Sequence, residues 1–190
     1  MEPAFIENKT FEKINFTDKP LKKGEYENCN FNFCDFSNTD FTDILFIECT
    51  FNNCNLSLVN LNNTAFRDCM FMECKMLGLR FDTCNKYGLL FKFESCTLNH
   101  STFYRTKLKN TGFSNSQLIE SDFSGSDLTG SVFDNCDLSG ATFEDTILEK
   151  VDFRSAYNYS FDPEVNKIKK AKFSLSGIAG LLTKYDIEIE

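Results

Sequence analysis

The sequence predicts an all-β solenoid that is square in cross-section, with short parallel strands stacked from coil to coil. Three observations support this prediction: an apolar residue recurs at every fifth position, cysteine pairs recur every 20 residues, and Phe alternates with Leu in the second half. In an α-helix, side chains five apart would spiral around every face. In a straight strand, every second one would face water. We therefore expect a chain that turns a corner every five residues.

The five-residue period runs in two registers. The first extends from Ile6 to Phe81, and the second, which alternates between Phe and Leu, extends from Phe93 to Phe153. Both the cysteine period and the Phe/Leu alternation fit four sides per coil, with Phe on two opposite sides and Leu on the other two. Stacked at the usual strand spacing of about 4.8 Å, about seven coils would form a rod on the order of 35 Å long.

The change of register divides what we expect to be one domain, residues 1–190. An N-terminal half spans 6–83 and a C-terminal half spans 93–153. The stretch between them, 84–92, contains two residues more than the repeat can place. We therefore expect these residues to bulge outward as a joint between the two halves.

Residues 154–190 leave the repeat and form a C-terminal segment. The spacing of Leu175, Ile178 and Leu182 predicts a short helix, and the alternating YDIEIE at 185–190 predicts a short closing strand. The segment has more apolar residues than the last coil needs as a cover, so we expect a homodimer through it. The predicted interface comprises Phe173, Leu175, Ile178, Leu181, Leu182, Tyr185, Ile187 and Ile189.

The nine cysteines have three possible explanations: a metal site, a disulfide framework, or the repeat itself. Every one lies two residues before a position of one of the two registers, where other repeats hold mainly Ser, Thr or Ala; that position is apolar in each case except Lys86, which follows Cys84. On an extended segment this position faces the same side as the centre, so a thiol there packs as a small apolar group. Stacked inward ladders do not bring four ligands together on one ion. We predict nine reduced thiols, no metal and no cofactor.

Composition restricts the function. The net charge of -8 and the pI of about 4.8 argue against direct binding to nucleic acid or to an anionic membrane. No signal peptide and no apolar run of about 18 residues is present in the sequence, which predicts a cytoplasmic protein. The single histidine, His100, falls at a corner, and the inward positions hold Phe and Leu. We therefore expect no catalytic residue and no enzymatic activity.

The repeats in SDFSGSDLTGSVFDNCDLSGATF (121–143) resemble the pentapeptide-repeat family, and the resemblance covers residues 6–153. It implies a right-handed quadrilateral parallel β-helix. The tail AKFSLSGIAGLLTKYDIEIE (171–190) is similar to the C-terminal dimerisation segment of the quinolone-resistance branch, Qnr and MfpA. Members of that branch are bacterial, acidic, dimeric rods that mimic B-form DNA and bind the type II topoisomerases DNA gyrase and topoisomerase IV.

The resemblance thus implies a topoisomerase partner and an effect on quinolone susceptibility; the alternative is a cytosolic scaffold for a different protein. Duplex DNA carries about one charge per 1.7 Å, so a dimeric rod of about 70 Å would need about 40 charges to match it. Two chains of net charge -8 supply only -16, so the mimicry must be local. The outward acids expected to contact the partner are Asp122, Asp127, Glu144, Asp145, Glu149 and Asp152.

Overall fold

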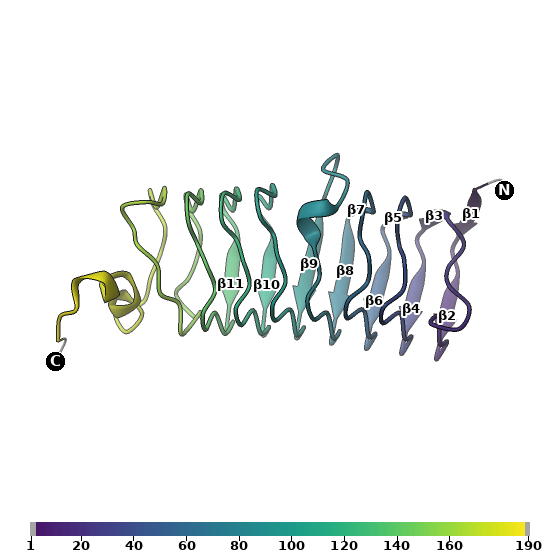
Figure 1. Ribbon diagram of the computed structural model, residues 1–190, viewed down its shortest axis with the longest axis horizontal. Coiled ribbons are helices and arrows are strands. Elements are labelled where there is room, and N and C mark those ends of the chain that lie inside the picture. Colours follow the sequence, from purple (N-terminus) through teal and green to yellow (C-terminus); the bar gives the residue numbers. More distant parts are fainter. Residues whose placement is uncertain (1–2, 189–190) are drawn as a thin grey trace.

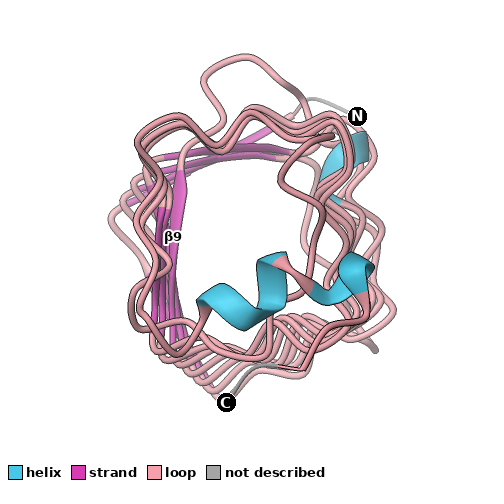
Figure 2. Ribbon diagram, turned by 90° about the vertical axis from the view of Figure 1, so that its left-hand side faces the viewer, coloured by secondary structure: helices cyan, strands magenta, loops and turns pink. Residues whose placement is uncertain are grey.

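The computed structural model describes residues 3–188, which wind into a rod with the two ends of the chain at opposite ends (Figure 1). Seen along the rod, each coil is a square (Figure 2). This architecture confirms the predicted right-handed quadrilateral parallel β-helix of about seven coils. Over the described residues, no helix is both long enough and apolar enough to cross a bilayer.

Two parallel sheets line two of the sides. The first has the strand order β1-β3-β5-β7 and the second the order β11-β10-β9-β8-β6-β4-β2. The remaining sides are joined by isolated parallel bridges between successive coils. The elements are β1 (Ala4–Glu7), β2 (Thr10–Glu12), β3 (Gly24–Glu27), β4 (Asn30–Asn32), β5 (Leu45–Ile47), β6 (Thr50–Asn52), β7 (Ala65–Arg67), β8 (Cys69–Met72), η1 (Phe81–Thr83), β9 (Phe91–Glu94), β10 (Gly112–Ser114), β11 (Val132–Asp134), η2 (Ile178–Leu181) and η3 (Thr183–Tyr185).

One side of the rod has phenylalanine at its centre in every coil. Neighbouring rings stack with centroids 4.8–5.5 Å apart and interplanar angles of at most 16°. In the C-terminal half a second Phe column meets this one edge to face, and buried Leu fills the two other sides, as predicted. The continuous column comprises Phe11, Phe31, Phe51, Phe71, Phe93, Phe113, Phe133, Phe153 and Phe173.

The corners of the square use left-handed backbone. The residue two after a centre usually has a positive φ, as at Asn28 (48°) and Asn135 (50°). Glycine and Asn adopt this conformation at the lowest cost, and Gly130, two residues after Leu128, has a φ of 74°. Even Phe33 is held there, with a φ of 54°. The repeating fold therefore imposes the corner on whatever residue occupies it.

The cysteines lie inside the wall as predicted, and all nine are free and buried. The structure adds a reason for the choice of residue. The thiols of Cys54 and Cys74 each lie 3.2–3.4 Å from the carbonyl oxygen of a phenylalanine in the preceding coil, Phe31 and Phe51. The hydroxyl of Thr64 donates to the carbonyl of Phe41 in the same way, at 2.8 Å. This position thus takes small donors, which explains why Cys, Ser and Thr alternate there.

Burial also shields all nine thiols from reagents in solution. It raises the pKa of Cys49 and of Cys136 to about 12, and the thiolate is the reactive form. We expect Ellman's reagent to modify none of the nine cysteines in the folded protein and all nine after denaturation. Modification of two or more in the folded protein would contradict this packing, as would a stoichiometric metal in elemental analysis or an intact mass showing disulfides.

The joint between the halves is the predicted two-residue bulge. Before it, paired residues are 20 apart, as in Phe51 and Phe71, whereas across it they are 22 apart, as in Phe71 and Phe93. The bulge projects from the rod next to η1 (Figure 1) and exposes 79% of Tyr87. Phe91, which lies beyond the last traced position of the first register but ten residues after Phe81 and so in phase with it, fills the core here.

The prediction that the repeat ends at Phe153 is wrong, because a further coil follows. Bridges join Ile147 to Lys167 and Asp152 to Lys172, and Phe173 stacks on Phe153 at 5.5 Å. The coil is hidden in the sequence because Asn158 and Pro163 occupy two of its centre positions. Its interior is filled by off-register aromatic residues instead, Tyr159 and Phe161.

The C-terminal segment differs from the prediction in two details. The expected helix is a pair of 3₁₀ turns, η2 and η3, because Gly177 and Gly180 pack so closely on Tyr159 that a Cβ would collide with it. The expected closing strand is not formed over 186–188, where no neighbouring strand is present to pair with it. Ile189 and Glu190 lie outside the described residues.

Candidate protein-interaction surfaces

The six predicted contact acids fall into two groups. Asp122, Asp127 and Asp152 lie just before a centre, and each accepts a hydrogen bond from the backbone N–H two residues later, at 2.9–3.2 Å. Such a bond stabilises the turn at the corner. No hydrogen bond or ion pair from residues 3–188 reaches the carboxylates of the second group, which are Glu144, Asp145 and Glu149. The second group is therefore free to contact a partner.

Ion pairs further restrain two members of the first group, Asp127 and Asp152. The pKa of Asp152 is lowered to about 2, mainly by hydrogen bonds from the guanidinium of Arg154. Burial acts in the opposite direction, but the backbone N–H of Arg154 and the positive charges of Arg154 and of Lys172, which lies 3.6 Å away, lower the pKa further. Burial raises the pKa of Asp127, but bonds from Thr129 and the ammonium of Lys109, 3.1 Å away, outweigh it and leave the pKa below its usual value. These carboxylates are ionised at neutral pH, but basic side chains of the same rod partly neutralise their charges.

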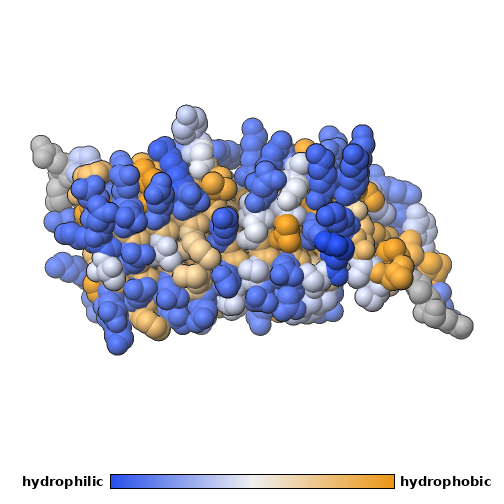
Figure 3. Space-filling view, turned by 180° about the vertical axis from the view of Figure 1, so that it is seen from behind, coloured by the Kyte–Doolittle hydropathy of each residue, from blue (hydrophilic) through white to orange (hydrophobic). Residues whose placement is uncertain are grey.

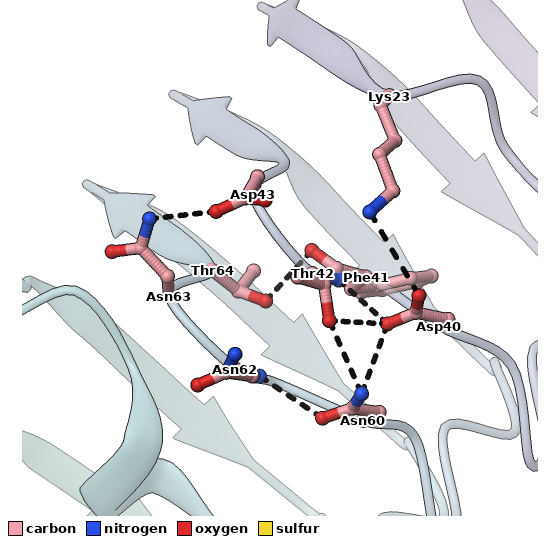
Figure 4. A network of polar contacts seen from close by, with 9 residues as sticks. All are labelled: Lys23, Asp40, Phe41, Thr42, Asp43, Asn60, Asn62, Asn63 and Thr64. Atoms are coloured by element: carbon pink, nitrogen blue, oxygen red, sulfur yellow. Dashed lines mark hydrogen bonds and ion pairs between the residues drawn. The ribbon is translucent and has the colours of Figure 1, made fainter.

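The N-terminal half uses its polar residues in the same way (Figure 4). The side-chain amide of Asn60 donates to both Asp40 and Thr42 of the preceding coil, at 3.1 Å each. Asp40 also caps the N–H of Thr42 and lies 4.0 Å from Lys23, while Asn60 accepts from the N–H of Asn62. This polar network links adjacent coils, so its side chains stabilise the rod rather than offering free charge.

Charge is distributed in bands along the rod. Residues 110–149, about two coils, contain eight Asp and Glu and no Lys or Arg. Residues 24–66 contain six acids and likewise no basic residue, whereas 67–109 contain eight Lys and Arg against four acids. The net charge of -8 is therefore the sum of two acidic bands, a basic band between them, and two ends of the chain that are close to neutral. We call residues 110–149 the acidic band.

One group of exposed apolar side chains lies at the C-terminal end, where hydrophobic residues gather in the space-filling view (Figure 3). Of the eight predicted interface residues, Leu181 is buried and Phe173 is partly buried, and both cover the last coil. Leu182 is partly buried as well. The side chains that face outward are Leu175 (92% exposed), Ile178, Tyr185 and Ile187, whereas Ile189 lies outside the described residues.

The turns η2 and η3 cover the last coil, and we call them the C-terminal cap. Polar contacts hold this cap against the flank of the rod. Lys184 lies 2.8 Å from a carboxylate oxygen of Asp162 and 2.7 Å from one of Glu164, and the Tyr185 hydroxyl donates to Glu164 at 3.1 Å. Ser160 shares a hydrogen bond with the cap as well. A cap held at its flank keeps its outward apolar residues in a defined arrangement, as a dimer interface requires.

His100 lies at the surface of the rod. Its Nδ1 lies 3.1 Å from Glu120 at an open corner, where both side chains are exposed. A groove of about 490 Å³ on the flank contains one charged residue, Arg80, and this is paired with Asp82 at 2.7 Å. Over residues 3–188, no group of three or more His, Cys, Asp or Glu side chains is arranged to hold a metal ion.

Three functional features escaped the sequence prediction. The acidic band was hidden because charge was summed over the whole chain; counting it coil by coil would have revealed it. The distinction between bonded and free acids depends on side-chain contacts between coils. The open N-terminal end, described below, depends on which strands lack a neighbour.

Comparison with known proteins agrees with this fold. The model of the pentapeptide repeat region matches residues 24–92, 44–123 and 89–157, well over half of the chain. Two solved structures of trypsin-treated variants of QnrB1, a plasmid-mediated fluoroquinolone resistance protein, superpose with TM-scores of 0.63 and 0.62. They share 16% and 15% identity and cover 97% and 95% of this chain and 99% and 98% of their own. The sequence has no significant match among curated proteins. The chain therefore belongs to the pentapeptide-repeat family, and its solenoid resembles that of QnrB1.

Proposed function

We propose that this protein is a non-enzymatic, cytoplasmic DNA mimic that binds a type II topoisomerase, DNA gyrase or topoisomerase IV, at its DNA-binding surface. The acidic band is the observation that supports this most directly. The likeness of the fold to QnrB1, whose description is that of a fluoroquinolone resistance protein, supports the same partner class.

The charge density of the acidic band matches that of duplex DNA, although the total charge of the rod does not. Two coils at the strand spacing rise by about 10 Å. Duplex DNA carries about six charges over that length. The acidic band carries eight, with no cation of its own between residues 110 and 149. A cationic surface shaped for DNA would therefore meet a comparable density of charge over this part of the rod.

The band also contains the free carboxylates. Glu144, Asp145 and Glu149 lie within it and need break no ion pair on binding, whereas Asp127 would have to exchange Lys109 for a partner. We therefore assign the main contact to the three free acids. In a dimer joined at the C-terminal caps, two such bands would lie on either side of the junction.

The test is a binding assay with purified DNA gyrase over a salt series. Binding led by charge should weaken steeply as the Debye length falls from about 10 Å at 0.1 M salt to about 3 Å at 1 M. Duplex DNA should compete. Replacing Glu144, Asp145 and Glu149 by Lys should abolish binding, whereas the same charge change at Glu7, Glu12 and Asp18 in the first coil should leave most of it.

If both variants lost binding to gyrase equally, the interaction would be a non-specific attraction between charges and not a contact of the acidic band. The absence of any DNA-competable binding at low salt would overturn the proposal and favour a scaffold for a different protein. Supercoiling assays with and without a fluoroquinolone separate inhibition from protection. We expect weak inhibition and little protection. In the quinolone-resistance branch that the sequence resembles, proteins that protect well usually carry longer projecting loops, whereas the main projection of this rod before the C-terminal segment is the short bulge around Tyr87.

A further inference from the structure

The two ends of the rod differ. At the C-terminal end, η2 and η3 lie across the last coil and cover its aromatic residues. At the N-terminal end, β1 and β2 are the last strands of their sheets, so each has one edge without a strand partner. An unpaired parallel edge is a template for another strand. A solenoid needs a cap at each end, and only one is present over residues 3–188.

The open end is also apolar and hollow. A depression of about 310 Å³ lies over the first coil, and Phe5 of β1 is 61% exposed. Lys19 and Lys22 are on its rim, and no acid among the described residues pairs with either of them. The depression is lined by Ile6, Phe11, Ile14, Phe16, Lys19, Pro20, Leu21, Lys22 and Tyr26.

The opposite end of the same chain carries a segment with complementary properties. Residues 186–188 have no strand partner, although YDIEIE has the alternation of a strand. Ile187 is 55% exposed, and Asp186 and Glu188 flank it with negative charge. Asp186 has a left-handed backbone, with a φ of 48°. On becoming extended, the segment would supply an apolar side chain for a hollow, acids for a basic rim, and backbone groups for a free edge.

We propose that the open N-terminal end binds the C-terminal tail of a second copy of this chain, by addition of a strand to the edge of β1 or β2. Ile187 enters the depression, and the neighbouring acids face Lys19 and Lys22. Strand addition of this type is a general mode of peptide recognition. Two N-terminal ends do not pair with each other in this way, because both rims are basic.

The contact is heterologous, so it does not close on itself and joins rods head to tail. It takes Ile187 out of the predicted dimer interface and leaves Leu175, Ile178 and Tyr185 for a two-fold dimer. It does not depend on the topoisomerase proposal, since neither end belongs to the acidic band.

Complementation tests the contact. One variant, Lys19→Glu with Lys22→Glu, blocks the open end, and another, Ile187→Ser, weakens the tail. In sedimentation at low salt, each variant alone should be lighter than the unmodified protein. Their mixture should be heavier than either variant alone, because one supplies an intact tail and the other an intact end. The proposal is overturned if the unmodified protein sediments no faster than the variants. It is also overturned if the mixture of the two variants is no heavier than either variant alone.

A peptide provides a second measurement that does not need assembly. A labelled peptide of residues 183–190 should bind the full chain, and a scrambled peptide should not. Affinity should fall about tenfold, equivalent to about 1.4 kcal/mol, in the Lys19→Glu/Lys22→Glu variant. The control, Lys167→Glu with Lys169→Glu, has the same net charge and should bind as the unmodified protein does. Equal loss in both variants would also contradict the contact.

Discussion

Replacing Phe113 by Ala is expected to lower the free energy of unfolding by about 3–5 kcal/mol, the usual cost of deleting a buried aromatic ring. The ring is fully buried and stacks on Phe93 at 5.2 Å and on Phe133 at 4.8 Å. It also meets Phe103 and Phe123 edge to face. Removing the ring would leave a cavity, and the coils on both sides of it would lose contact. The loss is large because an ordinary domain has only about 5–15 kcal/mol of stability in total. Urea denaturation followed by circular dichroism would measure the change.

Phe33 provides the matched control, since it is the same residue type in the same rod. Its ring is 53% exposed and its φ is 54°, a conformation that Asn adopts more easily than Phe. We therefore expect Phe33→Asn to leave stability unchanged or to raise it by up to about 1 kcal/mol. If Phe113→Ala cost no more than Phe33→Asn, the stacked column would not be the source of the rod's stability.

The second large effect is expected at the C-terminal cap, where Leu175→Asp should convert the proposed dimer into a monomer. Leu175 is 92% exposed, so the substitution removes no contact within the chain. At the centre of an interface, a buried carboxylate without a partner costs about 2 kcal/mol or more, enough to raise the dissociation constant at least tenfold. Light scattering over a concentration series would show the change in mass. Leu182→Asp should act in the same direction.

Leu58→Asp is the control, because Leu58 is also an exposed leucine but lies at a corner far along the chain from the cap. It should leave the mass of the assembly unchanged. Truncation before Phe173 is a less specific test, since it also removes the last ring of the stacked column. A Leu175→Asp protein that remains dimeric would place the interface elsewhere. One that unfolds would show that the cap serves only to cover the last coil.

The sequence predicted the coil and much of its interior, because each five-residue side repeats the same physical requirement. A large apolar centre must reach the axis, a small residue must precede it by two, and a corner must follow it by two. Phe113 with Thr111 before it and Asn115 after it shows all three. The two-residue excess at the joint was likewise visible in the spacing alone.

The sequence could not predict the last coil, because its aromatic residues are out of register. Tyr159 and Phe161 fill an interior whose regular positions are occupied by Asn158 and Pro163, and only contact with the coil beneath makes this arrangement stable. The cap is a similar case. Its apolar spacing suggested a helix, but the close approach of Tyr159 to Gly177 and Gly180 produced tighter turns.

By itself, the sequence determined the solenoid, the buried thiols and the acidic composition, since these follow from residue types at fixed spacing. Only the tertiary structure decided which charges are available. Asp152 and Glu149 are both outward acids three residues apart, yet Arg154 and Lys172 neutralise the first, whereas no described residue pairs with the second. Coil stacking brings Lys172 beside Asp152 across 20 positions of sequence, and a carboxylate's availability depends on such neighbours.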